Sequence, residues 1–195
     1  MVNNCLYFAF ATVADSRDDY YQQRAGLLQE ELESTAFVDK LGAVIRSEVI
    51  RTPQAADDFG RRAAQSGAQA MIIHIPIWAD PELSLSLAQS FGGPVLLLGN
   101  TRGTTSSVVG TLGAGGGLDQ CGISHSRVFG SGEAQQETVL QFLRAAYAKK
   151  ALAGSTMLRF GERSLGIVTA DPVEALWRQD FSVSVRQLPQ EQIVE

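Results

Sequence analysis

The 195-residue sequence has only two cysteines, only two histidines and no run of more than two basic residues. Cys5 and Cys121 stand far apart among apolar or small neighbours, which predicts buried thiols rather than a disulfide framework or a zinc knuckle. The net charge of −5, with no basic cluster, argues against nucleic acid or an anionic membrane as a partner. The ligand expected from this composition is a small molecule.

Long hydrophobic runs are also missing. Apolar runs such as residues 70–73 and 94–98 are far too short to cross a bilayer. The first residues carry no basic segment of the kind that opens a signal peptide, so a cytoplasmic protein is expected. With 45% hydrophobic and 19% charged residues, the chain has the composition of an ordinary globular protein.

Apolar segments of strand length alternate with helical patterns, which is typical of βα units around a mostly parallel sheet. This pattern predicts a three-layer, Rossmann- or flavodoxin-like, doubly wound α/β domain over residues 1–154. The expected strands are residues 5–13, 43–51, 68–75, 94–98 and 126–129. The expected helices are residues 18–35, 53–67, the segment that starts at Asp80-Pro81, and 133–153.

The segment 155–195 reads as the beginning of a second α/β domain that is incomplete. A strand is expected at 165–169, a helix after the capping-box-like sequence 171–174, a strand at 183–187 and the start of a helix at 189–195. One βαβ unit is too small to close a core of its own. The chain is therefore expected to be a fragment, or one domain followed by part of a second.

Ligands of open parallel sheets bind beyond the carboxyl ends of the strands. The residues that follow the first, third and fourth expected strands are Asp15, Ser16, Arg17, Trp78, Ala79, Asp80, Asn100, Thr101, Arg102 and Thr104. An arginine fork, an indole face and several hydroxyl or amide groups suit a polyhydroxylated or anionic small ligand. Two alternatives stay open: Arg17 could pair with the nearby aspartates at the surface, and Trp78 could cap the core.

Other chemistry is poorly supported. His74 lies inside an expected strand and His125 just before one, without the spacing of zinc-binding helices, so structural roles are expected for both. No G-x-S-x-G elbow accompanies the serines, which argues against a hydrolase. The glycine-rich stretch GTLGAGGGLDQCG at 110–122 lacks the spacing and the place of a dinucleotide loop, which argues against a nucleotide-dependent oxidoreductase.

Several segments, in order and spacing, resemble the L-fucose isomerase family and its shorter fucose/arabinose isomerase-like relatives. These are IPIWADPE at 75–82, FGGPVLLLG at 91–99, the long segment 127–171 from RVFGSGE to GIVTAD, and WRQDFSVSVRQLPQEQIV at 177–194, in which Ser182 stands where glycine is usual. The resemblance places GTLGAGGGLDQCG on the helix between the fourth and fifth strands, held by close packing rather than by helix propensity.

The resemblance implies an aldose–ketose isomerase that acts on a monosaccharide and forms trimer-based or hexameric assemblies. Members hold Mn²⁺ with two carboxylates and a histidine in their second and third domains, and nothing in this chain matches those ligands. The chain alone is therefore expected to be catalytically silent and to bind no metal. Its implied part is subunit packing and substrate contact, with Arg17 and Trp78 reaching a neighbouring subunit's site. The alternative is a non-catalytic small-molecule-binding or assembly domain.

Overall fold

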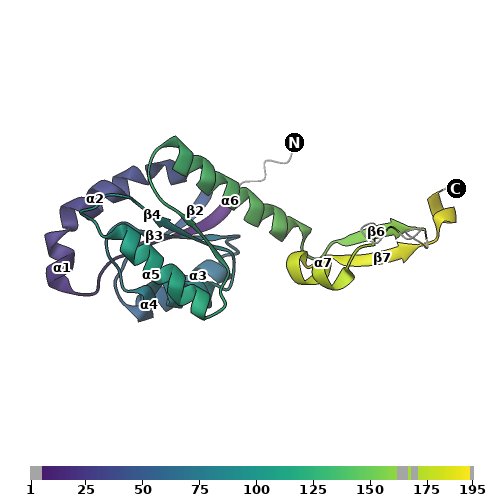
Figure 1. Ribbon diagram of the computed structural model, residues 1–195, viewed down its shortest axis with the longest axis horizontal. Helices are drawn as coiled ribbons and strands as arrows, with labels where there is room; N and C mark the ends of the chain where they lie inside the picture. Colours follow the sequence, from purple (N-terminus) through teal and green to yellow (C-terminus); the bar gives the residue numbers. More distant parts are fainter. Residues whose placement is uncertain (1–5, 162–166, 168–170, 194–195) are drawn as a thin grey trace. The chain divides into compact units, whose positions relative to one another are not determined.

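The computed structural model describes residues 6–161, 167 and 171–193 (Figure 1). It divides into two compact units, Met1–Ala146 and Tyr147–Glu195. The first unit contains a five-stranded parallel sheet. Its strands are β1 (Tyr7–Val13), β2 (Ala43–Ile50), β3 (Met71–Ile75), β4 (Val95–Gly99) and β5 (His125–Val128). Their spatial order is β2-β1-β3-β4-β5, the order of flavodoxin-like folds.

Helices cover both faces of this sheet, as the expected three-layer fold requires. They are α1 (Asp18–Gln23), α2 (Ala25–Ser34), the 3₁₀ helix η1 (Ala36–Lys40), α3 (Pro53–Gln65), α4 (Pro81–Phe91), α5 (Ser107–Gln120) and α6 (Glu133–Leu152). Strand β1 shows how the layers form: Ala9 and Ala11 join the core with α3, α4 and α5, whereas Phe8 and Phe10 join the core with η1 and α6. The alternating side chains of one strand thus bury both faces.

Most expected elements of the first unit are present, and the helix expected over 18–35 and the strand expected from residue 68 differ from the structure. The single helix expected over 18–35 is two helices, because Arg24 leaves the helical conformation (φ −116°, ψ 7°) and its guanidinium stacks 3.8 Å from the centre of the Tyr20 ring. The strand expected from residue 68 begins at Met71. Thr52 caps α3 as predicted and accepts a hydrogen bond from the Ala55 N–H at 3.3 Å.

Residues 110–120 of the glycine-rich stretch lie in helix α5, so this stretch is not a phosphate-binding loop. The helix lies close to the sheet: a Cβ on Gly110 would stand 3.2 Å from Ile75 Cγ2, and one on Gly115 would stand 3.0 Å from Arg127 Nη1 and 3.1 Å from His125 Nε2. By contrast, a Cβ on Gly116 would meet nothing within 4 Å. Close approach therefore explains some of these glycines and not others.

This difference gives a first prediction. Gly116→Ala is expected to raise the free energy of unfolding by about 0.5–1 kcal/mol, because alanine favours the helix and finds open space. Gly115→Ala is expected to gain less or to lose stability, because Arg127 and His125 must move. Urea denaturation of both variants and the wild type measures the difference, and equal gains at the two positions would contradict it.

Cys121 is exposed and His74 is buried. Cys121 is exposed, so the expectation of a buried thiol is wrong there: it follows the last turn of α5, before Gly122 (φ 67°), outside the packed face of the helix. Cys5 lies outside the described residues. His74 is a buried core residue of β3, and burial, followed by the charge of Arg46, lowers its pKa to about 3, so the ring stays neutral.

The second unit has a two-stranded parallel sheet of β6 (Thr156–Phe160) and β7 (Ser184–Leu188), with helix α7 (Glu174–Phe181) between them in the chain and a final 3₁₀ helix η3 (Gln190–Ile193). The strand expected at 165–169 lies almost wholly outside the described residues. The expected capping box is wrong, since α7 begins at Glu174 and Val173 makes no side-chain cap. Ser182 ends α7 at φ 54°, a left-handed conformation that favours glycine.

Candidate functional site

The candidate site lies at the carboxyl ends of β1 and β3. In the order β2-β1-β3-β4-β5 the direction of winding reverses between β1 and β3, and this is the point at which such sheets bind ligands. The loop at 14–17 follows β1 and the loop at 76–80 follows β3. The structure therefore places Arg17 and Trp78, the two residues singled out from the sequence, on the loops that flank this reversal.

Arg17 is held in place by a buried carboxylate. Arg17 Nε donates to Asp15 Oδ1 at 2.9 Å, Arg17 Nη2 donates to Asp15 Oδ2 at 2.6 Å, and the Arg17 backbone N–H donates to Oδ1 at 2.7 Å. The Asp15 side chain is 0% exposed, whereas that of Arg17 is 66% exposed. The pairing with an aspartate expected as an alternative is thus present, and it leaves the outer edge of the guanidinium facing solvent.

The same hydrogen bonds shift the titration of both groups. The hydrogen bond from the Arg17 side chain, opposed by burial, lowers the pKa of Asp15 below its ordinary value of 3.8. The Asp15 carboxylate in turn raises the pKa of Arg17. The pair therefore stays charged at neutral pH, and the arginine offers a permanent set of N–H donors to a ligand oxygen.

Arg51 is a member of this site that the sequence interpretation missed. Its Nε donates to the Asp15 carbonyl at 3.1 Å, and its Nη2 donates to the Ser16 carbonyl at 3.2 Å and to Asp18 Oδ1 at 2.6 Å. The expected strand 43–51 included Arg51, whereas β2 ends at Ile50, so the strand-end rule would have found Arg51 had the strand been ended one residue earlier. Its contacts indicate a residue that shapes the loop after β1.

Trp78 is half-buried on the neighbouring loop. Its backbone N–H donates to the Thr105 carbonyl at 2.9 Å, which ties the loop after β3 to the loop after β4. The loops after β1 and β3 are joined directly, since Ser16 Oγ donates to Asp80 Oδ2 at 2.8 Å. Asp80 stands at the N-cap of α4, but its carboxylate binds Ser16 rather than capping the helix. Arg17 and Trp78 are therefore carried by two loops that are hydrogen-bonded to each other.

The loop after β4 is mainly structural. Asn100 is buried, donates from Nδ2 to the Pro76 carbonyl at 2.7 Å and accepts from Thr105 Oγ1 at 2.8 Å. Arg102 does not stand free in solvent: it forms ion pairs with Glu30 at 2.8 Å and Glu31 at 3.0 Å, and these acids raise its pKa. Asn100 therefore holds the backbone of this loop, and Arg102 pairs with acids of α2. Thr101 and Thr104 are exposed.

Within the described residues, no three His, Cys, Asp or Glu side chains are grouped so that they could hold a metal ion. His125 shares its surroundings with Asp119, 3.7 Å away, and Arg127, which is no ligand set. The loops at the carboxyl ends of β1 and β3, called the β1/β3 edge below, offer guanidinium N–H donors, an indole face and hydroxyl groups to a ligand.

The comparisons with known proteins concern the family of the chain. Residues 13–154 match the family model described as L-fucose isomerase, first N-terminal domain. The match covers well over half of the chain. It contains Arg17, Trp78 and the loops that follow β1 and β3. No curated protein matches the chain. None of the helices in the described part of the chain is long and apolar enough to serve as a membrane span.

Proposed function

The chain belongs to the L-fucose isomerase family, and we propose that it supplies substrate contacts and subunit packing to a sugar isomerase-like protein. The ligand in this proposal is a monosaccharide bound at the β1/β3 edge. The observation that carries the proposal is the geometry of Arg17, whose inner edge is held by buried Asp15 while its outer edge faces solvent at the winding reversal.

The chemistry of this edge suits a sugar. A guanidinium has five N–H donors, and Asp15 uses the Nε proton and one Nη2 proton, so three remain for hydroxyl or carbonyl oxygens. Trp78 adds a flat apolar surface on the adjoining loop, against which the C–H groups of a sugar ring can pack. Because Asp15 pre-orders the guanidinium, little side-chain entropy is lost when the ligand binds.

The catalytic groups lie outside this chain in our proposal. In the family, Mn²⁺ polarises the sugar oxygens while carboxylates move a proton between neighbouring carbons. The described residues assemble no site for such an ion. The role assigned to this chain is therefore to position a sugar whose reacting atoms face groups on another part of the assembly.

Assembly follows from the same proposal. The site is a surface edge with exposed residues around it, and Arg17 alone is 66% exposed. A neighbouring subunit in a trimer or hexamer would close this edge and exclude water from the sugar. The protein is proposed to work in the cytoplasm, in keeping with the expectation from its sequence.

The second candidate is a non-catalytic small-molecule-binding or assembly domain. It is favoured by the same lack of a metal-binding group among the described residues. The two candidates differ in what happens when the chain is joined to proteins that carry the family's catalytic domains. If the chain is part of an isomerase, joining it to such proteins restores or raises their conversion of L-fucose to L-fuculose. If it is a free-standing binding domain, this conversion does not change.

Substrate binding can be tested on the chain itself. L-Fucose is expected to bind in the millimolar range, a free energy of about −4 kcal/mol, because only one wall of the site is present. Arg17→Ala and Trp78→Ala are each expected to weaken binding about tenfold, through loss of charged hydrogen bonds or of the apolar face. Saturation-transfer NMR with L-fucose measures this.

The control for that experiment is Trp177→Phe, which removes an indole from the other unit and should leave the NMR signals unchanged. Equal binding in the wild type and in both site variants would rule out the β1/β3 edge as the sugar site. Turnover of L-fucose by the chain alone with added Mn²⁺ would contradict the placement of the catalytic groups outside it.

A further inference from the structure

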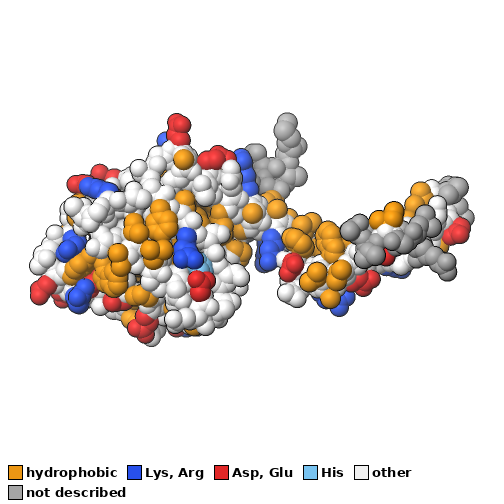
Figure 2. Space-filling view, in the orientation of Figure 1, with side chains coloured by type: hydrophobic (Ala, Val, Ile, Leu, Met, Phe, Trp, Pro, Cys, Tyr) orange, Lys and Arg blue, Asp and Glu red, His pale blue; other side chains and the backbone are white. Residues whose placement is uncertain are grey.

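The arginines of the β1/β3 edge are each matched by a carboxylate. Arg17 pairs with buried Asp15 at 2.6 Å, and Arg51 pairs with Asp18 at 2.6 Å. Figure 2 shows acidic and basic side chains interspersed over α1 and its surroundings. Asp80, on the loop after β3, adds a third carboxylate to the edge. These side chains therefore bring more negative than positive charge to the edge, although two of them are arginines.

Asp80 is turned towards the loop that carries Arg17. It occupies the N-cap of α4, where an aspartate usually accepts a hydrogen bond from the first turn of its own helix, but its side chain makes no such bond. Instead, Oδ2 accepts from Ser16 Oγ at 2.8 Å and from the Ser16 backbone N–H at 3.4 Å. Ser16 directly precedes Arg17. Asp15 is the main cause of the raised pKa of Arg17, and the charge of Asp80 adds to it.

The second oxygen of the Asp80 carboxylate is placed to serve a ligand. Both hydrogen bonds from Ser16 go to Oδ2, and none from the described residues goes to Oδ1. Ser16 is exposed and Asp80 is half-buried, so solvent reaches this pair. An ionised carboxylate only accepts hydrogen bonds, whereas a guanidinium only donates them. The edge therefore presents donors on Arg17 and an acceptor on Asp80, from two loops that are hydrogen-bonded to each other.

We infer that Asp80 accepts a hydrogen bond from a sugar hydroxyl and makes the site selective for uncharged sugars over their phosphate esters. The inference rests on the proposed sugar site. A hydroxyl group both donates and accepts, so neighbouring hydroxyl groups of one sugar can accept from Arg17 and donate to Asp80. A phosphate ester brings up to two negative charges at neutral pH. Asp80 repels these charges, while the charge of Arg17 is already balanced by Asp15.

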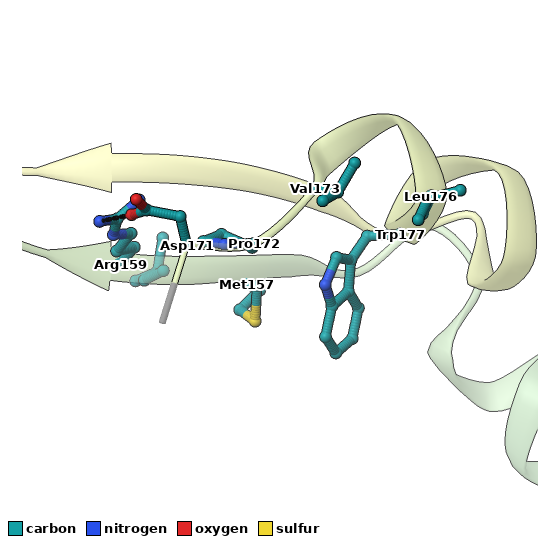
Figure 3. Close-up of a pocket in the computed structure, with 8 residues that line it drawn as sticks. Met157, Arg159, Asp171, Pro172, Val173, Leu176 and Trp177 are labelled. Atoms are coloured by element: carbon teal, nitrogen blue, oxygen red, sulfur yellow. Dashed lines mark hydrogen bonds and ion pairs between the residues drawn. The ribbon is translucent and has the colours of Figure 1, made fainter. Parts of the chain in front are cut away.

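A groove of about 500 Å³ in the other unit shows what Asp80 adds. The groove has the same three residue types, because Trp177, Arg159 and Asp171 line it, with the Arg159–Asp171 ion pair at one end (Figure 3). The other described lining residues are apolar: Met157, Leu158, Pro172, Val173 and Leu176. Among these residues no second carboxylate accompanies the ion pair. The selectivity is therefore assigned to the β1/β3 edge, where the extra carboxylate is present.

Binding of L-fucose and of L-fucose 1-phosphate to the whole chain tests this inference. In saturation-transfer NMR titrations the wild type is expected to bind L-fucose about tenfold more tightly than the phosphate. Asp80→Asn keeps an oxygen for the Ser16 hydroxyl and a residue suited to an N-cap, but removes the charge. It is expected to weaken L-fucose binding and to reduce the preference over the phosphate about fivefold. A variant with the preference of the wild type would overturn the inference.

Two controls separate ligand contact from loop structure and from net charge. Ser16→Ala removes the hydrogen bond from the Ser16 hydroxyl to Asp80 but keeps the charge, and Glu82→Gln removes an exposed charge from the first turn of α4. Both are expected to keep the preference of the wild type within about twofold. If either reduces it as Asp80→Asn does, the inference fails. If L-fucose does not bind, or binds independently of Arg17 and Trp78, the proposed sugar site fails as well.

Discussion

Gly60→Ala is expected to lower the free energy of unfolding of the N-terminal unit by about 2 kcal/mol. Gly60 lies on α3 and faces α4. A Cβ at this position would stand 2.9 Å from the Leu87 carbonyl oxygen and 2.7 Å from Ser90 Cβ. The carbonyl belongs to the backbone of α4, so the two helices must separate to admit the methyl group.

Urea denaturation measures this loss, with Gly116→Ala as the matched control. Both glycines lie in helix interiors, so helix propensity favours alanine at both, and only the space around the Cβ differs. The two variants are expected to change stability in opposite directions. If Gly60→Ala is as stable as Gly116→Ala, the close approach of α3 and α4 is not a determinant of the fold.

Asp15→Asn is expected to lower stability by about 2 kcal/mol and to weaken L-fucose binding as much as Arg17→Ala does. The buried carboxylate accepts from three N–H groups of Arg17. An amide offers one acceptor oxygen and places an NH₂ group against an arginine donor, which leaves buried polar groups unpaired. Urea denaturation measures the first effect, and saturation-transfer NMR measures the second. A variant that loses stability but binds sugar as the wild type does would separate Asp15 from the ligand site.

The stability difference between wild type and Asp15→Asn is also expected to depend on pH. The pKa of Asp15 is lowered in the folded state, chiefly by the Arg17 side chain. Its contribution is therefore fully present above the unfolded value, near 3.8, and is lost as pH falls through the lower folded pKa. Denaturation near neutral pH and well below pH 3.8 should show the gap shrinking. A gap that stays constant would show that the carboxylate charge does not stabilise the fold.

A surface variant serves as the control for the denaturation measurements and for their pH dependence. Asp18→Asn removes a carboxylate that is 83% exposed and pairs with Arg51. Exposed pairs contribute little, so a change below about 0.5 kcal/mol is expected. A loss larger than that of Asp15→Asn would mean that the ion pair of Arg51 with Asp18 matters more to the loop after β1 than the contacts of Arg17 with Asp15.

The family's first domain was predictable from the sequence because its signals are local. The Thr52-Pro53 and Asp80-Pro81 pairs start helices α3 and α4 where expected, since a proline at the first helical position needs no N–H partner. The exposure of Cys121 and the break at Arg24 were not predictable in this way. The exposure of Cys121 depends on where α5 ends relative to the sheet. The break at Arg24 depends on the contact of its side chain with the Tyr20 ring of α1.

By itself, the sequence determined the α/β class, the strands of the first unit and the place of Arg17 and Trp78 at strand ends, because periodicity and caps act over neighbouring residues. Only the tertiary structure decided the strand order β2-β1-β3-β4-β5, and with it the reversal that brings the loops of Arg17 and Trp78 together. It also decided that Asp15 is buried beneath Arg17, that Arg51 joins them, and which glycines of α5 touch the sheet. These facts depend on contacts between residues far apart in the chain, which no local pattern specifies.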